Sequence, residues 1–182
     1  ILLMDKCLEA KYLKIHIDTS IKCLDDRFLT NEEIFNRTKF ILDKIKLKKK
    51  IRNVFLVIGT EVPLSGGNDK SRIKLTSYNQ ISREVINFKK LLKINKIPPN
   101  LFALVIEPGM KYTHSKVTVP RFTKFRKKFF YSKKNHFVYE AHSTDFQKLF
   151  TLKSLVKNNF KFLKVGPELT FNLSKAIFFM EN

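Results

Sequence analysis

Five short apolar runs alternate with longer segments of helical periodicity, and this alternation constrains the fold more than any other feature. The runs that we interpret as strands span residues 13–19, 54–60, 102–107, 136–142 and 162–166. Each interval between them has room for one helix, the connection that parallel strands require. The pattern therefore predicts an α/β fold with a parallel sheet and helical crossovers.

Local signals place the helices between these strands. Thr30 and Glu33 form a capping-box pattern that opens a helix through about Lys50, and Ser77 with Gln80 opens a second helix that ends before Pro98-Pro99. A third helix is expected to begin near Pro120, because proline suits the first helical turn. The fourth runs through residues 152–156. The fifth follows Pro167, and the apolar residues that we expect it to bury are Leu169, Leu173, Ile177 and Phe178.

The composition fits one ordinary buried core. The chain of 182 residues is 43% hydrophobic, which excludes a disordered chain, and no apolar run is long enough to predict a transmembrane helix. It begins without an initiator methionine, so we expect a piece of a longer protein. Cys7 and Cys23 stand apart from any CxxC motif, which is typical of reduced thiols in a cytoplasmic protein.

A formal net charge of +20 raises the question of nucleic-acid binding. Most of the basic residues are lysines spread over every segment, and the densest runs, at 44–50 and 124–128, lie late in predicted helices. No nucleic-acid-binding motif accompanies them. We therefore expect solvated helix faces and neither a nucleic-acid nor a membrane partner, with a basic nucleic-acid-binding module as an alternative.

Charged side chains gather where the predicted strands end. Because the carboxyl ends of parallel strands share one edge of a sheet or barrel, such residues are expected to converge on an accessible site. The residues that we consider as catalytic are Asp18, Glu61, Glu107 and Lys164. For each of them the alternative is a structural role, as a loop cap or as the partner of a lysine.

Two residues of the fourth strand are candidate metal ligands. Glu140 and His142 share a face because side chains alternate along a strand. Catalytic zinc requires three protein ligands, so zinc is a candidate cofactor with an incomplete site. His16, on the face that also carries Asp18, is the other candidate, although its apolar neighbours favour a core histidine. His114 lies in a loop that is able to close over the site, and His136 is interpreted as structural.

A phosphate site is expected beyond the last two strands, where barrels bind phosphate. The chain has no GxxxxGK[ST] loop, which argues against phosphate transfer from ATP. A glycine followed by a proline at a helix start is typical of a barrel phosphate site, although Glu168 in the first turn would repel an anion. The candidate substrate- or phosphate-binding residues are Ser143, Thr144, Gly166 and Thr170.

Five motifs at the strand tips carry a family resemblance. In order they are Lys14–Ser20, Val57–Pro63, Ala103–Gly109, Tyr139–Gln147 and Leu163–Phe171. Together they closely resemble the non-catalytic (accessory) subunit family of class II tagatose-1,6-bisphosphate aldolase, the GatZ/KbaZ-like family. Some members of that family carry the label tagatose-6-phosphate kinase, which the missing phosphate loop argues against here.

The resemblance implies a class II aldolase-type TIM barrel. The five predicted strands would be strands four to eight, so that residues 1–182 form a single incomplete barrel domain. His142 falls on the strand that carries a zinc-binding histidine in active class II aldolases, whereas the Gly-Asp-His motif of those enzymes has no counterpart. Thr113 and Glu168 depart from the residues usual in relatives, which puts ligand binding in doubt.

The resemblance also implies a function. We expect an accessory subunit, or a fragment of one, without independent activity, which supports the activity and stability of a separate catalytic aldolase subunit in cytoplasmic sugar-phosphate catabolism, for example of galactitol or N-acetylgalactosamine. A sugar phosphate and further copies of the chain are candidate partners. The main alternative is a zinc-dependent sugar-bisphosphate aldolase or lyase in its own right.

Overall fold

A parallel five-stranded sheet forms the centre of the molecule. The computed structural model describes residues 2–24, 29–45, 51, 53–59, 75–97, 102–112, 116–122 and 125–181. The strands follow one another in space in the order of the sequence, and every neighbouring pair is parallel. They are β1 (Lys14–Ile17), β2 (Phe55–Ile58), β3 (Phe102–Val105), β6 (Val138–Ala141) and β7 (Phe160–Leu163).

Sequential strand order is the winding of a TIM barrel, whereas a doubly wound sheet reverses its order at a switch point. Contacts across the sheet show that it is also strongly curved. The Lys14 ammonium of β1 lies 4.8 Å from the centre of the Phe162 ring of β7, four strand positions away. In a flat sheet these strands would be about 19 Å apart, at ~4.8 Å per strand. The predicted α/β fold with part of a TIM barrel is therefore confirmed.

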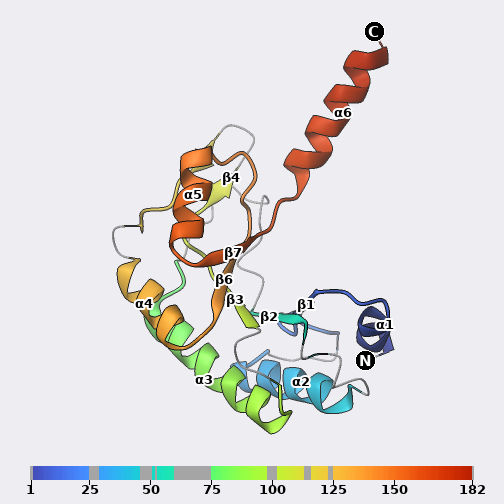
Figure 1. The fold of residues 1–182 in the computed structure, drawn as a ribbon, viewed down its shortest axis with the longest axis vertical. Coiled ribbons are helices and arrows are strands. Elements are labelled where there is room, and N and C mark those ends of the chain that lie inside the picture. Colours follow the sequence, from blue (N-terminus) through green and yellow to red (C-terminus); the bar gives the residue numbers. More distant parts are fainter. Residues whose placement is uncertain are drawn as a thin grey trace.

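Helices follow the strands and cover the convex side of this arc. Figure 1 shows α2 (Asn31–Lys44), α3 (Tyr78–Ile94) and α4 (Arg126–Lys134) along one side, and α5 (Leu149–Lys157) beside the later strands. Both predicted capping boxes are present, at Thr30 for α2 and at Ser77 for α3. The helices and the outward-facing strand residues enclose the main core, which includes Leu56, Leu92, Leu104 and Tyr139.

The concave face has a smaller apolar cluster. Val57, Ala103 and Val105 are buried there, with Val138 and Phe162 packed against them. Because side chains alternate along each strand, the residues of this face are those that point to the interior of a barrel. Polar residues of the same face lie beside this cluster, since His16 pairs with Val57 in the β1–β2 register and Glu140 pairs with Val105 in the β3–β6 register.

Two helix predictions are wrong. The third helix, α4, begins at Arg126 and not near Pro120, which lies in an irregular segment. The last helix, α6 (Pro167–Glu181), has no buried residue, although Leu169, Leu173, Ile177 and Phe178 were expected to be covered. The spacing of the apolar residues along α6 indicates an apolar face, but no described element packs over that face. Figure 1 shows α6 extending away from the sheet.

Other elements have shorter or unexpected bounds. Helix α2 ends at Lys44, short of the predicted Lys50, and residues 46–50 lie outside the described part. A helix, α1 (Leu2–Glu9), precedes β1, and a small antiparallel pair, β4 (Lys111–Tyr112) and β5 (Val117–Thr118), follows β3; neither was predicted. In the described ranges we find no helix with the length and apolar character needed to cross a membrane.

Candidate functional site

Glu140 lies at the centre of a polar cluster on the concave face of the sheet. Its side chain is completely buried and projects from β6. One oxygen, Oε1, lies 3.1 Å from His142 Nε2 and 3.7 Å from His16 Nδ1, and the other, Oε2, lies 2.5 Å from Lys14 Nζ. The cluster therefore joins β1 to β6, two strands that are not neighbours in the sheet.

Two histidines flank this carboxylate. The rings of His16 and His142 meet edge to face with 5.7 Å between their centres. Within the described part of the chain, the buried Nε2 atom of His16 has no hydrogen-bond partner. A buried polar atom without a partner is costly, so this atom is available to a ligand. The prediction that His16 is a core histidine is thus half right: it is largely covered, but it faces the polar cluster.

The electrostatics of the cluster favour an ionised Glu140 and a neutral His16. Burial opposes ionisation of Glu140, but the hydrogen bond to His142 and the ion pair with Lys14 outweigh it and lower the pKa of the carboxyl. Burial lowers the pKa of His16, and the Glu140 carboxylate only partly opposes this effect. A carboxylate and a neutral imidazole are the forms that bind metal ions.

These three residues form a set of metal-binding side chains. One ligand atom from each of His16, Glu140 and His142 lies within 4.8 Å of the others. Two imidazole nitrogens and one carboxylate oxygen match the protein ligands of many catalytic zinc sites, and His16 Nδ1 is the nitrogen that faces Glu140. The residues thus fit zinc, and a bound ion there would supply a Lewis acid.

The other predicted catalytic residues are engaged in local structure. Asp18 accepts hydrogen bonds from the backbone and the hydroxyl of Ser20, at 2.9 and 2.6 Å. Glu107 Oε1 accepts from the backbone N–H groups of Gly109 and Met110, at 2.6 and 2.7 Å. Burial raises the pKa of Glu107, although these two bonds and nearby His142 oppose the rise. Lys164 is exposed, and Glu61 and His114 lie outside the described residues.

Two of the four predicted phosphate-binding residues, Thr144 and Gly166, lie beside Asp145, a buried carboxylate that was not among the predicted site residues. Asp145 Oδ1 accepts from the backbone N–H groups of Gly166 and Glu168, at 2.9 and 3.0 Å. The Thr144 hydroxyl donates to the Lys164 carbonyl at 2.9 Å. Asp145 thus takes backbone donors that a phosphate at the start of α6 would use, and a phosphate would have to compete with it.

Ser143 and Thr170 are more open. Ser143 is half-buried, with a positive φ of 55°, directly after His142, and Thr170 is exposed on the first turns of α6. The structure therefore does not gather the four predicted phosphate-binding residues around one cavity. His136 is exposed before β6, away from the cluster.

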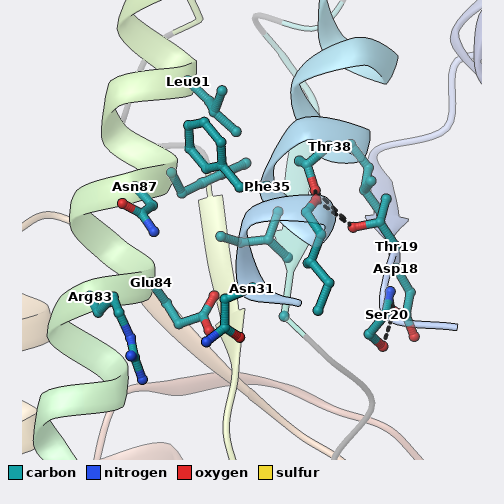
Figure 2. A pocket seen from close by; sticks show the side chains of 15 residues that line it. Asp18, Thr19, Ser20, Asn31, Phe35, Thr38, Arg83, Glu84, Asn87 and Leu91 are labelled. Carbon is teal, nitrogen blue, oxygen red and sulfur yellow. Dashed lines mark hydrogen bonds between the residues drawn. The ribbon is translucent and has the colours of Figure 1, made fainter. Parts of the chain in front are cut away.

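A separate cavity of about 60 Å³ lies between α2 and α3, beside the ends of β1 and β2. In Figure 2, Asn31 of α2 and Glu84 of α3 lie at one side of this cavity, and Asp18 and Ser20 lie at another. The hydroxyl groups of Thr19 and Thr38 are 2.9 Å apart and tie the end of β1 to α2. Burial raises the pKa of Glu84, with Arg83 opposing the rise. The cavity is outside the barrel interior and separate from the Glu140 cluster.

Lys14 and Asp145 belong to these sites but were not among the residues predicted from the sequence. A signal existed for Lys14, since it lies two residues before His16 and therefore shares its face. For Asp145 no local pattern identifies the partner, because Gly166 and Glu168 are more than 20 residues away in the sequence.

Comparison with known proteins places the chain in a family. The model of the family described as D-tagatose-1,6-bisphosphate aldolase subunit GatZ/KbaZ-like matches residues 2–182. The chain belongs to this GatZ/KbaZ-like family. The resemblance that the five strand-tip motifs indicated is thereby confirmed.

Relatives of this GatZ/KbaZ-like chain agree with the assignment. It is 31% identical over 180 residues to the D-tagatose-1,6-bisphosphate aldolase subunit GatZ of Escherichia coli O1:K1, covering 94% of this chain and 43% of that protein. The GatZ subunit of Salmonella newport SL254 is 29% identical over 178 residues, covering 93% and 42%. The chain thus spans less than half the length of these relatives.

A solved structure supports the fold. The crystal structure of a probable tagatose 6 phosphate kinase from Sinorhizobium meliloti 1021 superposes with a TM-score of 0.72 at 22% identity, over 92% of this chain and 41% of the other. At that identity the similarity concerns the fold of this GatZ/KbaZ-like chain, in agreement with its sequential parallel sheet.

Proposed function

We propose that this chain acts within an accessory, non-catalytic subunit of a class II tagatose-1,6-bisphosphate aldolase and supports the activity and stability of a separate catalytic subunit. The observation that carries the proposal is the family match over residues 2–182. The relatives described above are named as subunits of this aldolase, which supports a role inside a larger assembly.

The hydrogen bonds and the ion pair made by the acidic residues near the strand tips support a non-catalytic role. Asp18 and Glu107 accept hydrogen bonds from nearby backbone groups, and Asp145 holds the start of α6. Glu140 is paired with Lys14. Side chains that are occupied in this way stabilise a scaffold, and they are less available to a substrate than free acids or bases would be.

The proposal includes the setting of the chain. Residues 1–182 form one incomplete barrel domain that corresponds to strands four to eight. The chain works in the cytoplasm, which the isolated positions of Cys7 and Cys23 in the sequence, apart from any CxxC motif, support. A sugar phosphate and a second copy of the chain are its further partners, and neither nucleic acid nor membrane is among them.

Co-expression with a catalytic class II tagatose-bisphosphate aldolase subunit tests the proposal. We expect the two chains to co-purify, and we expect the catalytic subunit to cleave tagatose 1,6-bisphosphate faster and to survive heating longer. A class II aldolase specific for fructose bisphosphate serves as the matched control and should gain nothing. An unchanged cleavage rate and half-life, without co-purification, would contradict the accessory role.

A second candidate function is a zinc-dependent aldolase in its own right, and the convergence of His16, Glu140 and His142 favours it. Aldol cleavage by the zinc-loaded chain alone, lost in His142→Gln, would support this function over the accessory role.

A nucleic-acid-binding module would instead bind DNA with an affinity that falls steeply as the salt concentration rises. We expect no such salt-dependent binding.

A further inference from the structure

We propose that His16, Glu140 and His142 bind a divalent transition-metal ion, with zinc favoured, and that Lys14 competes with this ion for Glu140. The proposal concerns the chain itself and does not depend on the accessory function. A metal-binding test and the co-purification test can therefore fail separately.

The geometry supplies three ligands from two separate strands. His16 comes from β1, whereas Glu140 and His142 come from β6 and the residue after it, and their ligand atoms lie within 4.8 Å of one another. Bonds to zinc of about 2.0–2.2 Å bring ligand atoms somewhat closer than this. Small side-chain movements would therefore complete the site.

The burial of the cluster favours a bound cation. Glu140 is completely buried and His142 is 8% exposed. The His16 nitrogen that faces the carboxylate is Nδ1, 3.7 Å from Glu140 Oε1. Imidazole nitrogens together with a carboxylate are a donor set that zinc accepts well.

Lys14 occupies the place of a cation beside Glu140. Its ammonium contacts Glu140 Oε2 at 2.5 Å and also lies 4.8 Å from the centre of the Phe162 ring. A divalent ion on the same carboxylate would be repelled by this positive charge. The Lys14 side chain is 36% exposed, so it has a path toward solvent when a metal ion enters. The ion pair therefore keeps Glu140 neutralised without metal and weakens metal binding.

Cobalt titration of the 182-residue chain tests the site, because Co²⁺ bound by nitrogen and oxygen ligands absorbs visible light. We expect one ion per chain, displaced by Zn²⁺. Variants His16→Gln, Glu140→Gln and His142→Gln should each bind at least about tenfold more weakly, since each loses a ligand. His136→Asn removes a histidine that is exposed before β6 and should leave the affinity unchanged.

A second pair of variants tests the competition. Lys14→Met removes the ammonium, and we expect it to bind Co²⁺ roughly tenfold more tightly or better. Lys161→Met is the matched control, because Lys161 is exposed on β7, next to Phe162 in the sequence. Its affinity should equal that of the unmodified chain. Equal affinities of the Lys14 and Lys161 variants would overturn the competition.

A measurement on the unmodified chain keeps the test valid if a variant fails to fold. Zn²⁺ that binds the folded state should raise the melting temperature, whereas Mg²⁺, which prefers oxygen ligands, should not. Absent cobalt absorption together with an unchanged melting temperature in Zn²⁺ would overturn the metal site. Cobalt absorption that survives in the His16→Gln/His142→Gln double variant would also overturn it.

Discussion

Lys14 and Glu140 form an ion pair across the interior of the sheet, with the Lys14 ammonium 2.5 Å from the carboxylate. They come from β1 and β6, which are separated in the sheet by β2 and β3. Such a contact requires the sheet to curve like a barrel wall. The ion pair therefore shows that the sheet is curved. Its ammonium group also offsets the negative charge of Glu140, the residue at the centre of the candidate metal site.

Loss of Lys14 should destabilise the fold. In Lys14→Met the buried Glu140 keeps its charge but loses its ammonium partner, which we expect to lower the free energy of unfolding by about 2 kcal/mol. This value is below that of a fully buried pair because Lys14 is partly exposed. Urea unfolding without metal measures the change. Lys161→Met should stay within about 0.5 kcal/mol of the unmodified chain, and an equal loss in both variants would contradict the role of the pair.

Glu107 should make stability depend on pH. Burial raises the pKa of Glu107 above its ordinary value of 4.5. The stability that this shift adds to the folded state is therefore fully present below pH 4.5 and is lost as the pH rises through the raised pKa. Glu107→Gln keeps an oxygen for the N–H groups of Gly109 and Met110 but carries no charge. We expect it to match or exceed the unmodified chain in unfolding free energy at pH 7, with a smaller difference near pH 4.

Glu107→Ala separates the two effects in the same urea experiments. It removes both the charge and the acceptor, so the two backbone N–H groups lose their partner and the chain should be less stable than Glu107→Gln at both pH values. Higher stability of the alanine variant at pH 7 would show that the hydrogen bonds contribute nothing.

Asp145 should hold the start of α6. In Asp145→Ala the N–H groups of Gly166 and Glu168 lose their acceptor, and we expect a loss of about 1 kcal/mol, as for other helix caps. Hydrogen exchange should speed up most in residues 166–171. Asp145→Asn retains one side-chain oxygen and should lose less protection. Unchanged exchange in the alanine variant would argue against the cap.

Gly59 should tolerate no side chain. It has φ +124°, and a Cβ atom there would lie 3.0 Å from Val105 Cβ and 3.1 Å from its backbone nitrogen. Gly59→Ala should therefore cost about 2 kcal/mol or more in urea unfolding, from strain and overpacking. At Gly166 a Cβ atom would make only ordinary contacts, the nearest at 3.9 Å. Gly166→Ala should be nearly neutral, and equal losses at the two glycines would refute the argument.

Local patterns predicted much of this fold. The alternation of strands and helices, the capping boxes at Thr30 and Ser77, and the parallel sheet are confirmed because each depends on neighbouring residues or on crossover length. The start of α4 was misplaced because proline at position 120 is compatible with irregular structure as well as with a helix start. The burial of α6 was wrong because an apolar stripe does not specify what covers it.

For the candidate site too, the sequence predicted some features and the tertiary structure alone decided others. Alternation along one strand was enough to place Glu140 and His142 on a common face, and the sequence by itself determined the residue types, the family motifs and the order of the strands. Only the tertiary structure decided that His16 and Lys14 meet Glu140, and that Asp145 holds the start of α6. These contacts join residues that are 21 to 126 positions apart. His16 and Lys14 meet Glu140 because the sheet curves and brings β1 toward β6, whereas Asp145 meets Gly166 because β6 and β7 are neighbours in the sheet. No local pattern encodes either the curvature or the strand pairing.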